Sequence, residues 1–193
     1  GRVVFGLYGS DAPKTVEHFL KFIEGTEGPS YASGIVFRHE PGKWIEGGRI
    51  SGLYTTDLAG QEVYEYLGKV VNLKPLLEGN DLKHETKALL THRKFNPGPE
   101  FGVTLAPSPE LDGFWTVFGE VLEGQEFIEE VARLPYVTGK SVDPSGSASD
   151  QWWQAQNRYF LGLAKQFGDT RANKKYPGKL LRRVEMTKCG ILS

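Results

Sequence analysis

A series of short apolar runs limits the folds that this chain can adopt. Each run is a few residues long, is rich in aliphatic or aromatic residues, and ends at glycine, proline or a polar residue. Runs of this length and composition are typical of β-strands. The chain also holds 24 glycines, which suit the turns between short strands. The runs lie at residues 3–8, 35–38, 44–46, 88–91, 103–105, 115–119 and 183–187.

Two stretches in the first 135 residues have the spacing of an amphipathic helix. Ser10 or Asp11 is expected to cap the first helix, Pro13 fits in its first turn, and Gly25 ends it. The second helix is predicted at residues 125–134. Many strands and few helices predict a mainly β fold, a barrel with helices at its ends. The apolar positions are Val16, Phe19, Leu20 and Ile23 in the first helix and Phe127, Ile128, Val131 and Leu134 in the second.

The overall composition is that of one ordinary globular domain. The 193 residues fit a single domain spanning 1–193, with 39% hydrophobic and 24% charged residues. With a net charge of −1, the chain lacks the excess positive charge that is typical of proteins that bind nucleic acid or anionic membranes. No apolar run is long enough to predict direct membrane insertion. With one cysteine, no intrachain disulfide can form. Residues 51–80 show no clear period and are expected to be rich in loops.

Several catalytic patterns can be set aside. The run 138–141 ends like a phosphate-binding loop, but that pattern needs glycine where Leu134 stands. The four histidines lack the spacing of metal ligands, and no Gly-x-Ser-x-Gly motif is present. Cys189 is expected to be a small buried residue of the last strand. Neither a metal nor a cofactor is therefore expected.

Six motifs in sequence order give the chain its resemblance to a known family. It resembles the cyclophilins, the peptidyl-prolyl isomerases that bind cyclosporin, over most of residues 1–135 and at the end. The motifs are Gly1-Arg2-Val3-Val4 through Asp11-Ala12-Pro13-Lys14-Thr15-Val16-Glu17-His18-Phe19, then Ile45-Glu46-Gly47-Gly48, Leu82-Lys83-His84, Leu111-Asp112-Gly113, Val117-Phe118-Gly119-Glu120-Val121 and Cys189-Gly190-Ile191-Leu192.

The resemblance implies a particular architecture. It implies a closed eight-stranded β-barrel capped by two helices, with the first strand upstream of Gly1. The chain departs from the family at residues 136–179, where a short loop is replaced by an insertion. Residues 143–149 are expected to be a flexible loop, and Asp150 to cap an extra helix before the last strand.

The resemblance also implies a catalytic residue. Prolyl isomerisation rotates an amide across a barrier of about 18–20 kcal/mol and needs no nucleophile or metal. It needs a hydrogen-bond donor to the prolyl nitrogen and an apolar pocket for the ring. Arg38 matches the family's donor, and Leu111 matches a kept pocket residue. At other pocket positions this chain carries a different residue from the family. Lys43 and Trp44 stand where the family has Phe and Met, and Glu46 and Glu100 each stand where it has Gln. Gly102, Glu110 and Trp115 stand where it has Phe, Trp and His.

These changes predict a silenced site. Two carboxylates, Glu46 and Glu100, are expected to face the Arg38 guanidinium in charge-assisted pairs, against which a neutral substrate amide competes poorly. Gly102 removes a wall of the pocket, and Trp44 and Trp115 are expected to fill the vacated groove. Large charged residues also replace small ones around residues 91–94. The alternative left open is that Arg38 remains a working catalyst.

The insertion offers a second surface. Its aromatic helix carries adjacent tryptophans, which point to different sides of a helix, so one side can pack on the barrel while the other stays available. One interpretation is a cap over the barrel, and the other is a docking surface for a partner protein. The residues assigned to partner binding are Trp152, Trp153, Tyr159 and Phe160.

The sequence leaves three functions open. The first is an interaction or assembly subunit with weak or no isomerase activity, the second an active isomerase that assists folding through Arg38, and the third binding of proline-containing polypeptides without turnover. The closest resemblance is to divergent plant and algal plastid cyclophilin-like proteins, through residues 167–171 and 176–181. It implies residence in the chloroplast, with the thylakoid as one candidate location. A plastid membrane-associated complex is a candidate partner.

Overall fold

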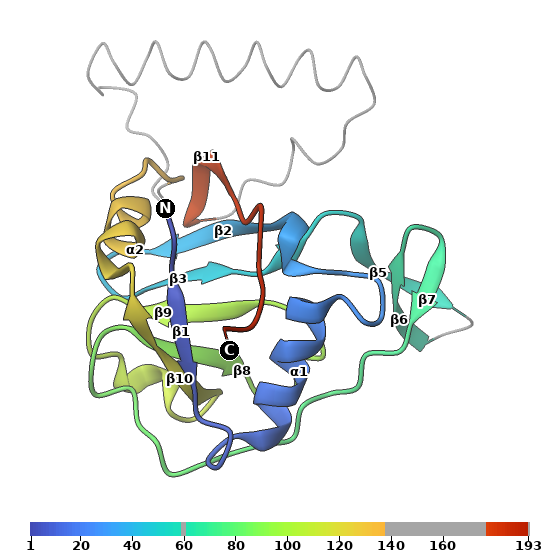
Figure 1. The fold of residues 1–193 in the computed structure, drawn as a ribbon, viewed down its shortest axis with the longest axis horizontal. Helices are drawn as coiled ribbons and strands as arrows, with labels where there is room; N and C mark the ends of the chain where they lie inside the picture. Colours follow the sequence, from blue (N-terminus) through green and yellow to red (C-terminus); the bar gives the residue numbers. More distant parts are fainter. Residues whose placement is uncertain (59–60, 138–176, 193) are drawn as a thin grey trace.

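The structure is a computed structural model that describes residues 1–58, 61–137 and 177–192 (Figure 1). The predicted inserted helix, with Trp152, Trp153, Tyr159 and Phe160, lies outside the described residues. The elements of the main sheet are β1 (Val4–Leu7), β2 (Gly34–Glu40), β3 (Trp44–Gly47), β4 (Arg49–Ile50), β8 (Leu89–Arg93), β9 (Phe101–Thr104), β10 (Trp115–Glu123) and β11 (Lys179–Glu185). The remaining elements are α1 (Pro13–Glu24), α2 (Gln125–Ala132), the 3-10 turns η1 (Tyr31–Ser33) and η2 (Pro109–Leu111), and strands β5 (Leu53–Leu58), β6 (Gln61–Tyr66) and β7 (Lys69–Val71).

The main sheet is antiparallel and strongly curled, with α1 and α2 packed beside it (Figure 1). Its order is β1-β10-β8-β9-β3-β2-β11, and β4 pairs with β2. This confirms the predicted mainly β fold with two helices. The closed barrel is a correction: within the described residues, β1 and β11 are the two edges of the sheet and do not pair with each other. A barrel closes only when its edge strands hydrogen-bond, so the sheet here is a curled half-barrel.

The core lies between the curled sheet and α1. Phe19 of α1 contacts Phe101 and Phe118 of the sheet, with ring centroids 5.2 Å apart in both pairs. Tyr31 packs on the rings of Phe19 and Phe101 and donates its hydroxyl to the carbonyl of Pro99 at 2.6 Å. The helical spacing predicted for α1 is confirmed, because the helix buries this face and ends at Gly25, whose φ of 67° is left-handed.

The N-terminus of α1 is capped from a distant segment. Residues 72–88 form a strap that runs from β7 past the start of α1 to β8 (Figure 1). The Glu78 carboxylate on this strap accepts hydrogen bonds from the amides of Lys14 and Thr15, at 3.0 and 2.7 Å. It also accepts one from the Thr15 hydroxyl at 2.6 Å. The predicted local cap is therefore wrong: the N-cap residue is Ala12, and a carboxylate supplied through the tertiary fold replaces Ser10 or Asp11.

Residues 51–80 are more ordered than the sequence predicts. They contain a second, three-stranded sheet in the order β5-β6-β7, which projects from the main body (Figure 1). Its second hairpin turns at Leu67 and Gly68, both with positive φ, of 50° and 80°. Such a two-residue turn matches the twist of a hairpin, but its usual signature is Asn-Gly. Because Leu67 occupies the first position of the turn, the sequence does not show this signature.

The C-terminal segment also differs from its prediction. β11 begins at Lys179 and ends at Glu185, earlier than the run 183–187. Cys189 follows the strand, is only partly buried, and donates its thiol to the carbonyl of Ile23 at 3.3 Å. The thiol therefore ties the tail to α1. Among the described residues, no helix is long and apolar enough to span a membrane.

Candidate active site

The β2–β3 hairpin brings Arg38 and Glu46 together. The chain turns at Pro41 and Gly42, where Gly42 supplies a φ of 72°, and β3 returns antiparallel to β2. In this register Arg38 lies directly opposite Glu46, and Glu46 lies opposite Gly102 of β9. Residues opposite one another on neighbouring strands project from the same face of the sheet. The sheet thus gathers three of the predicted site residues in one row.

Arg38 is held by two carboxylates. Its Nη1 lies 3.3 Å from Oε1 of Glu46, and its Nη2 lies 3.4 Å from Oε2 of Glu40. The Arg38 side chain is 31% exposed, whereas that of Glu46 is only 3% exposed. Among the described residues, the buried Nε of Arg38 has no hydrogen-bond partner. The guanidinium is therefore anchored at its tip by charge-assisted contacts.

A second arginine binds the same carboxylate. Arg93, at the end of β8, donates from Nη2 to both oxygens of Glu46 at 3.0 Å. The indole N–H of Trp44 donates to Oε1 of Glu46 at 3.3 Å. The nearly buried carboxylate thus contacts two guanidinium groups and one indole, which compensates the desolvation of its charge.

Glu100 does not take the expected place beside Arg38. The described ion pairs of Arg38 are with Glu46 and Glu40, and Glu100 lies just before β9. It is two residues from Gly102, which is opposite Glu46, and two residues of strand span about 6.6 Å. Burial raises the pKa of the Glu100 carboxyl, and the charges of Arg49 and Arg93 only partly offset this effect.

The floor of the site is filled by an indole ring. A Cβ on Gly102 would lie 3.3 Å from Cζ3 of Trp115 and 2.9 Å from Cγ2 of Thr91. Trp115 is 7% exposed, and Cζ of Arg93 lies 4.6 Å from its ring centroid. The ring of Trp44 lies 6.4 Å from that of Trp115. Glycine at 102 therefore leaves space that Trp115 occupies, and Arg93 covers the indole from above.

The rim of the site carries another ion pair. Nζ of Lys43 lies 2.6 Å from Oε1 of Glu110 and 6.0 Å from the ring centroid of Trp44. The hydrogen bond with Glu110 raises the pKa of Lys43, and the same bond lowers the pKa of Glu110. Leu111, the kept pocket residue, is buried beside Glu110 on η2.

Two contributors were not assigned to the site from the sequence, although Arg93 belongs to the charged run noted at residues 91–94. Glu40 lies two positions after Arg38 on the same strand, so the two-residue period of a strand places it on the same side. That signal was available in the sequence. Arg93 comes from β8, and its contact with Glu46 depends on the pairing of β8 with β9 and of β9 with β3. No local pattern reveals such a contact.

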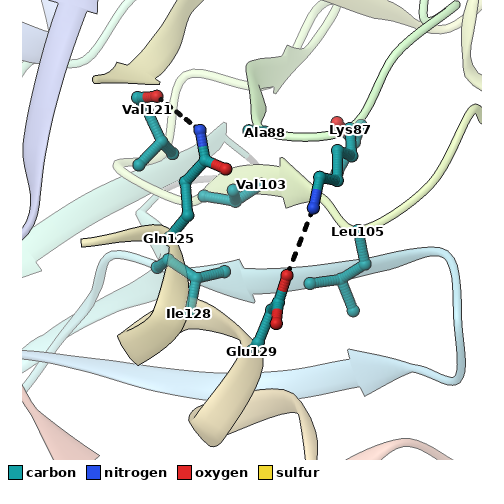
Figure 2. A pocket seen from close by; sticks show the side chains of 9 residues that line it. Lys87, Ala88, Val103, Leu105, Val121, Gln125, Ile128 and Glu129 are labelled. Carbon is teal, nitrogen blue, oxygen red and sulfur yellow. Dashed lines mark hydrogen bonds and ion pairs between the residues drawn. The ribbon is translucent and has the colours of Figure 1, made fainter. Parts of the chain in front are cut away.

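Two surface hollows have neither Arg38 nor Glu46 in their lining, and Glu100 lines the second of them. Figure 2 shows the first, about 270 Å³, between α2 and the sheet, with Val103, Leu105 and Ile128 among its walls. Lys87 and Glu129 form an ion pair at 3.3 Å across it. The second is about 550 Å³ and lies between β5–β6 and the residues around Pro99, with Arg49, Glu100, Tyr54 and Tyr64 in its lining. The described residues contain no cluster of three or more potential metal ligands.

The curled antiparallel sheet flanked by two helices, with Arg38 beside the Pro-Gly hairpin, is consistent with the architecture that the sequence motifs imply. The family comparison agrees: residues 1–147 match the family described as "Cyclophilin type peptidyl-prolyl cis-trans isomerase/CLD". The chain belongs to the cyclophilin-type peptidyl-prolyl cis-trans isomerase family. The resemblance found in the sequence motifs is confirmed at the family level.

One curated relative is Peptidyl-prolyl cis-trans isomerase D of Saccharomyces cerevisiae. It is 32% identical over 138 residues, which cover 69% of this chain and 57% of the yeast protein. The chain therefore spans somewhat more than half the length of this relative.

Proposed function

We propose that this cyclophilin acts mainly as an interaction or assembly subunit, with weak or no prolyl isomerase activity. One observation carries the proposal: the Glu46 carboxylate contacts both Arg38 and Arg93 above a floor filled by Trp115. The residue that should serve the substrate is committed to the protein itself.

The ion pair opposes catalysis by Arg38. At 3.3 Å and an effective dielectric constant near 20, the attraction between two unit charges is about 5 kcal/mol before desolvation. A substrate amide is neutral, so its hydrogen bond to the guanidinium is weaker than a charge-assisted one. Because Glu46 and Glu40 hold the tip of the guanidinium, Arg38 can follow the prolyl nitrogen during rotation only by weakening these contacts, which adds to the barrier.

The filled floor opposes substrate binding. A prolyl ring needs an apolar slot close to the donor, and binding of the transition state depends on that contact. Here the indole of Trp115 lies within 3.3 Å of where a Gly102 side chain would begin, and Arg93 lies over the indole. The ring would have to displace a nearly buried tryptophan.

A protease-coupled assay with a proline-containing peptide tests the proposal on the purified chain. We expect the rate with the wild-type chain to match that with Arg38→Ala and the uncatalysed rate. Activity that disappears in Arg38→Ala would overturn the proposal. It would favour the second candidate, a folding isomerase that uses Arg38, for which the 31% exposure of this side chain is the supporting observation. Peptide titration with and without Arg38 tests binding without turnover.

The location and partner remain proposals as well. We propose chloroplast residence, on the resemblance of residues 167–171 and 176–181 to plastid cyclophilin-like proteins. We also propose that the aromatic residues at 152, 153, 159 and 160 contact a protein partner, such as a subunit of a plastid membrane-associated complex. Fractionation of the native source tests both. Comigration with a thylakoid complex supports them, and a protein found outside plastids contradicts them.

A further inference from the structure

Three large apolar side chains lie exposed beside the filled site. They are Leu77, Phe95 and Phe114, which are 65%, 64% and 75% exposed. They come from the strap, from the loop after β8, and from the turn before β10. Backbone hydrogen bonds join these segments: Phe95 N donates to the carbonyl of Leu76 at 2.9 Å, and Lys94 N donates to that of Phe114 at 2.8 Å. These three residues are called the Phe95 surface below.

Phe95 adopts a backbone conformation that is unfavourable for phenylalanine. Its φ is 66°, a left-handed conformation in which a bulky side chain is an outlier and glycine or asparagine is preferred. The ring gains little burial in return, since most of it faces solvent. Residues kept in unfavourable conformations cluster at functional sites. An exposed aromatic ring at such a position is suited to contact another molecule.

Positive charge borders the Phe95 surface. Within the described part of the chain, Arg93 donates to Glu46 through Nη2 and lies over Trp115, and its side chain is 42% exposed. Among the described residues, Nζ of Lys94 binds only neutral carbonyls, those of Asp112 and Gly113, at 3.3 and 3.5 Å.

Two carboxylates close to Phe114 in the chain, those of Asp112 and Glu110, already have partners in the described fold. Asp112 binds His84 at 2.6 Å, and Glu110 binds Lys43 at 2.6 Å. Lys94 has no carboxylate partner among the described residues, and Arg93 is 42% exposed although Glu46 pairs with it. An apolar surface bordered by these two cations complements a segment with acidic and apolar side chains.

We propose that the Phe95 surface, with Arg93 and Lys94, is a docking site for a partner protein through a segment that places an acidic side chain next to aromatic or aliphatic ones. This inference rests on the proposed role as an interaction subunit. Aromatic residues and arginine dominate the energetics of protein interfaces. The surface adjoins the filled site through Arg93, which lies two residues before Phe95 in the chain and covers Trp115.

The test uses a fluorescein-labelled peptide of about twelve residues in which Asp alternates with Phe and Leu. Two control peptides replace Asp with Lys or Phe with Ser. Fluorescence anisotropy is expected to show saturable binding of the acidic-apolar peptide and at least tenfold weaker binding of both controls. Amide shifts on titration are expected at residues 76–77, 93–95 and 112–114. Equal binding of the peptides, or shifts elsewhere, would overturn the proposal.

A variant separates docking from folding. Phe95→Asn relieves the left-handed backbone, so its thermal midpoint is expected to equal or exceed that of the wild type while peptide affinity falls at least tenfold. Leu122→Asn is the matched control, because Leu122 is 58% exposed on β10 outside the Phe95 surface, and its affinity should not change. Undiminished binding by Phe95→Asn refutes the docking site. The isomerase assay is a separate measurement. A chain that has no isomerase activity and does not bind the peptide refutes only the docking site. A chain that shows Arg38-dependent isomerase activity and still binds the peptide refutes only the proposed function.

Discussion

Both oxygens of Glu46 accept a hydrogen bond from Nη2 of Arg93, although the two residues are 47 positions apart in the sequence. The same carboxylate contacts Arg38, so a residue of β8 helps to set the environment of the arginine on β2. Arg93 therefore has two roles: it balances the negative charge of Glu46, and it covers the ring of Trp115.

The Glu46→Gln variant should be less stable than the wild type. The substitution removes the buried charge that both guanidiniums contact, and we expect a loss of about 1–3 kcal/mol because the arginines keep partial access to water. Urea denaturation measures it. Glu110→Gln, which breaks only the exposed pair with Lys43, is the control and should change the unfolding free energy little. Equal effects of the two variants would contradict the prediction.

Gly102 and Trp115 should be thermodynamically coupled. Gly102→Ala introduces a Cβ 2.9 Å from Thr91 and 3.3 Å from Trp115, and we expect it to cost about 1–3 kcal/mol. In the background of Trp115→Ala the cost should fall, giving a coupling energy of about 1 kcal/mol in a double-mutant cycle. Gly9→Ala meets nothing within 4 Å and serves as the control. Strict additivity would show that the indole does not limit the space at 102.

Restoring the family's pocket should restore activity. The combined variant Glu46→Gln, Arg93→Ala, Gly102→Phe and Trp115→His removes the ion pairs and reopens an apolar floor. We expect kcat/KM in the protease-coupled assay to rise at least about tenfold over the wild type, the equivalent of roughly 1.4 kcal/mol of barrier. Adding Arg38→Ala should abolish the gain. A folded combined variant without activity would mean that the silencing lies elsewhere.

Removal of the distant helix cap should be costly. Glu78→Ala leaves the amides of Lys14 and Thr15 without their acceptor, and we expect a loss of about 1–2 kcal/mol, typical of helix caps. Thermal unfolding monitored by circular dichroism gives the value. The exposed Glu85 on the same strap provides the control, since Glu85→Ala removes a similar charge without touching α1. A cost no larger than that of the control would argue against the cap.

Stability should fall on mild acidification because of His92. Burial lowers its pKa to about 4, although its Nε2 and Nδ1 lie 3.1 and 2.9 Å from carbonyl oxygens. The unfolded chain, with a histidine pKa near 6.5, takes up the proton first, so protonation favours unfolding between pH 6.5 and 4. The loss attributable to His92 should approach about 3 kcal/mol at pH 4. His18, whose pKa burial also lowers, contributes in the same direction.

The pH dependence can be assigned with His92→Gln. Its side-chain amide can donate to a carbonyl without titrating, so its unfolding free energy should vary less between pH 6.5 and 4 than that of the wild type. Urea denaturation at several pH values measures both proteins. Identical pH profiles would exclude His92 as the source.

The parts of the fold that rest on local patterns were predictable from the sequence. The spacing of Val16 and Phe19 locates α1, and the Pro41-Gly42 turn places Arg38 near Glu46. The β5–β7 sheet was not predicted, because its turn places leucine where asparagine or glycine is usual. Whether the barrel closes depends on the pairing of the edge strands β1 and β11, which no local sequence pattern encodes.

The candidate site shows the same division. Glu40 could have been found from the two-residue period of β2. The contacts of Arg93 and the position of Trp115 over Gly102 depend on which strands become neighbours, and so does the separation of Glu100 from Arg38. Side chains that meet through β8, β9 and β3 are set by long-range strand order, which the sequence discloses only once the family architecture is assumed.

The strap has a consequence for the order of folding. The first turn of α1 takes its acceptor from a residue 63 to 64 positions away, so the helix cannot complete its start before the strap arrives. Contacts between residues so distant in sequence form slowly. The amide protons of Lys14 and Thr15 should therefore become protected from hydrogen exchange late in refolding, after those in the middle of the helix. Early protection of these two amides would show that α1 forms its first turn independently of the strap.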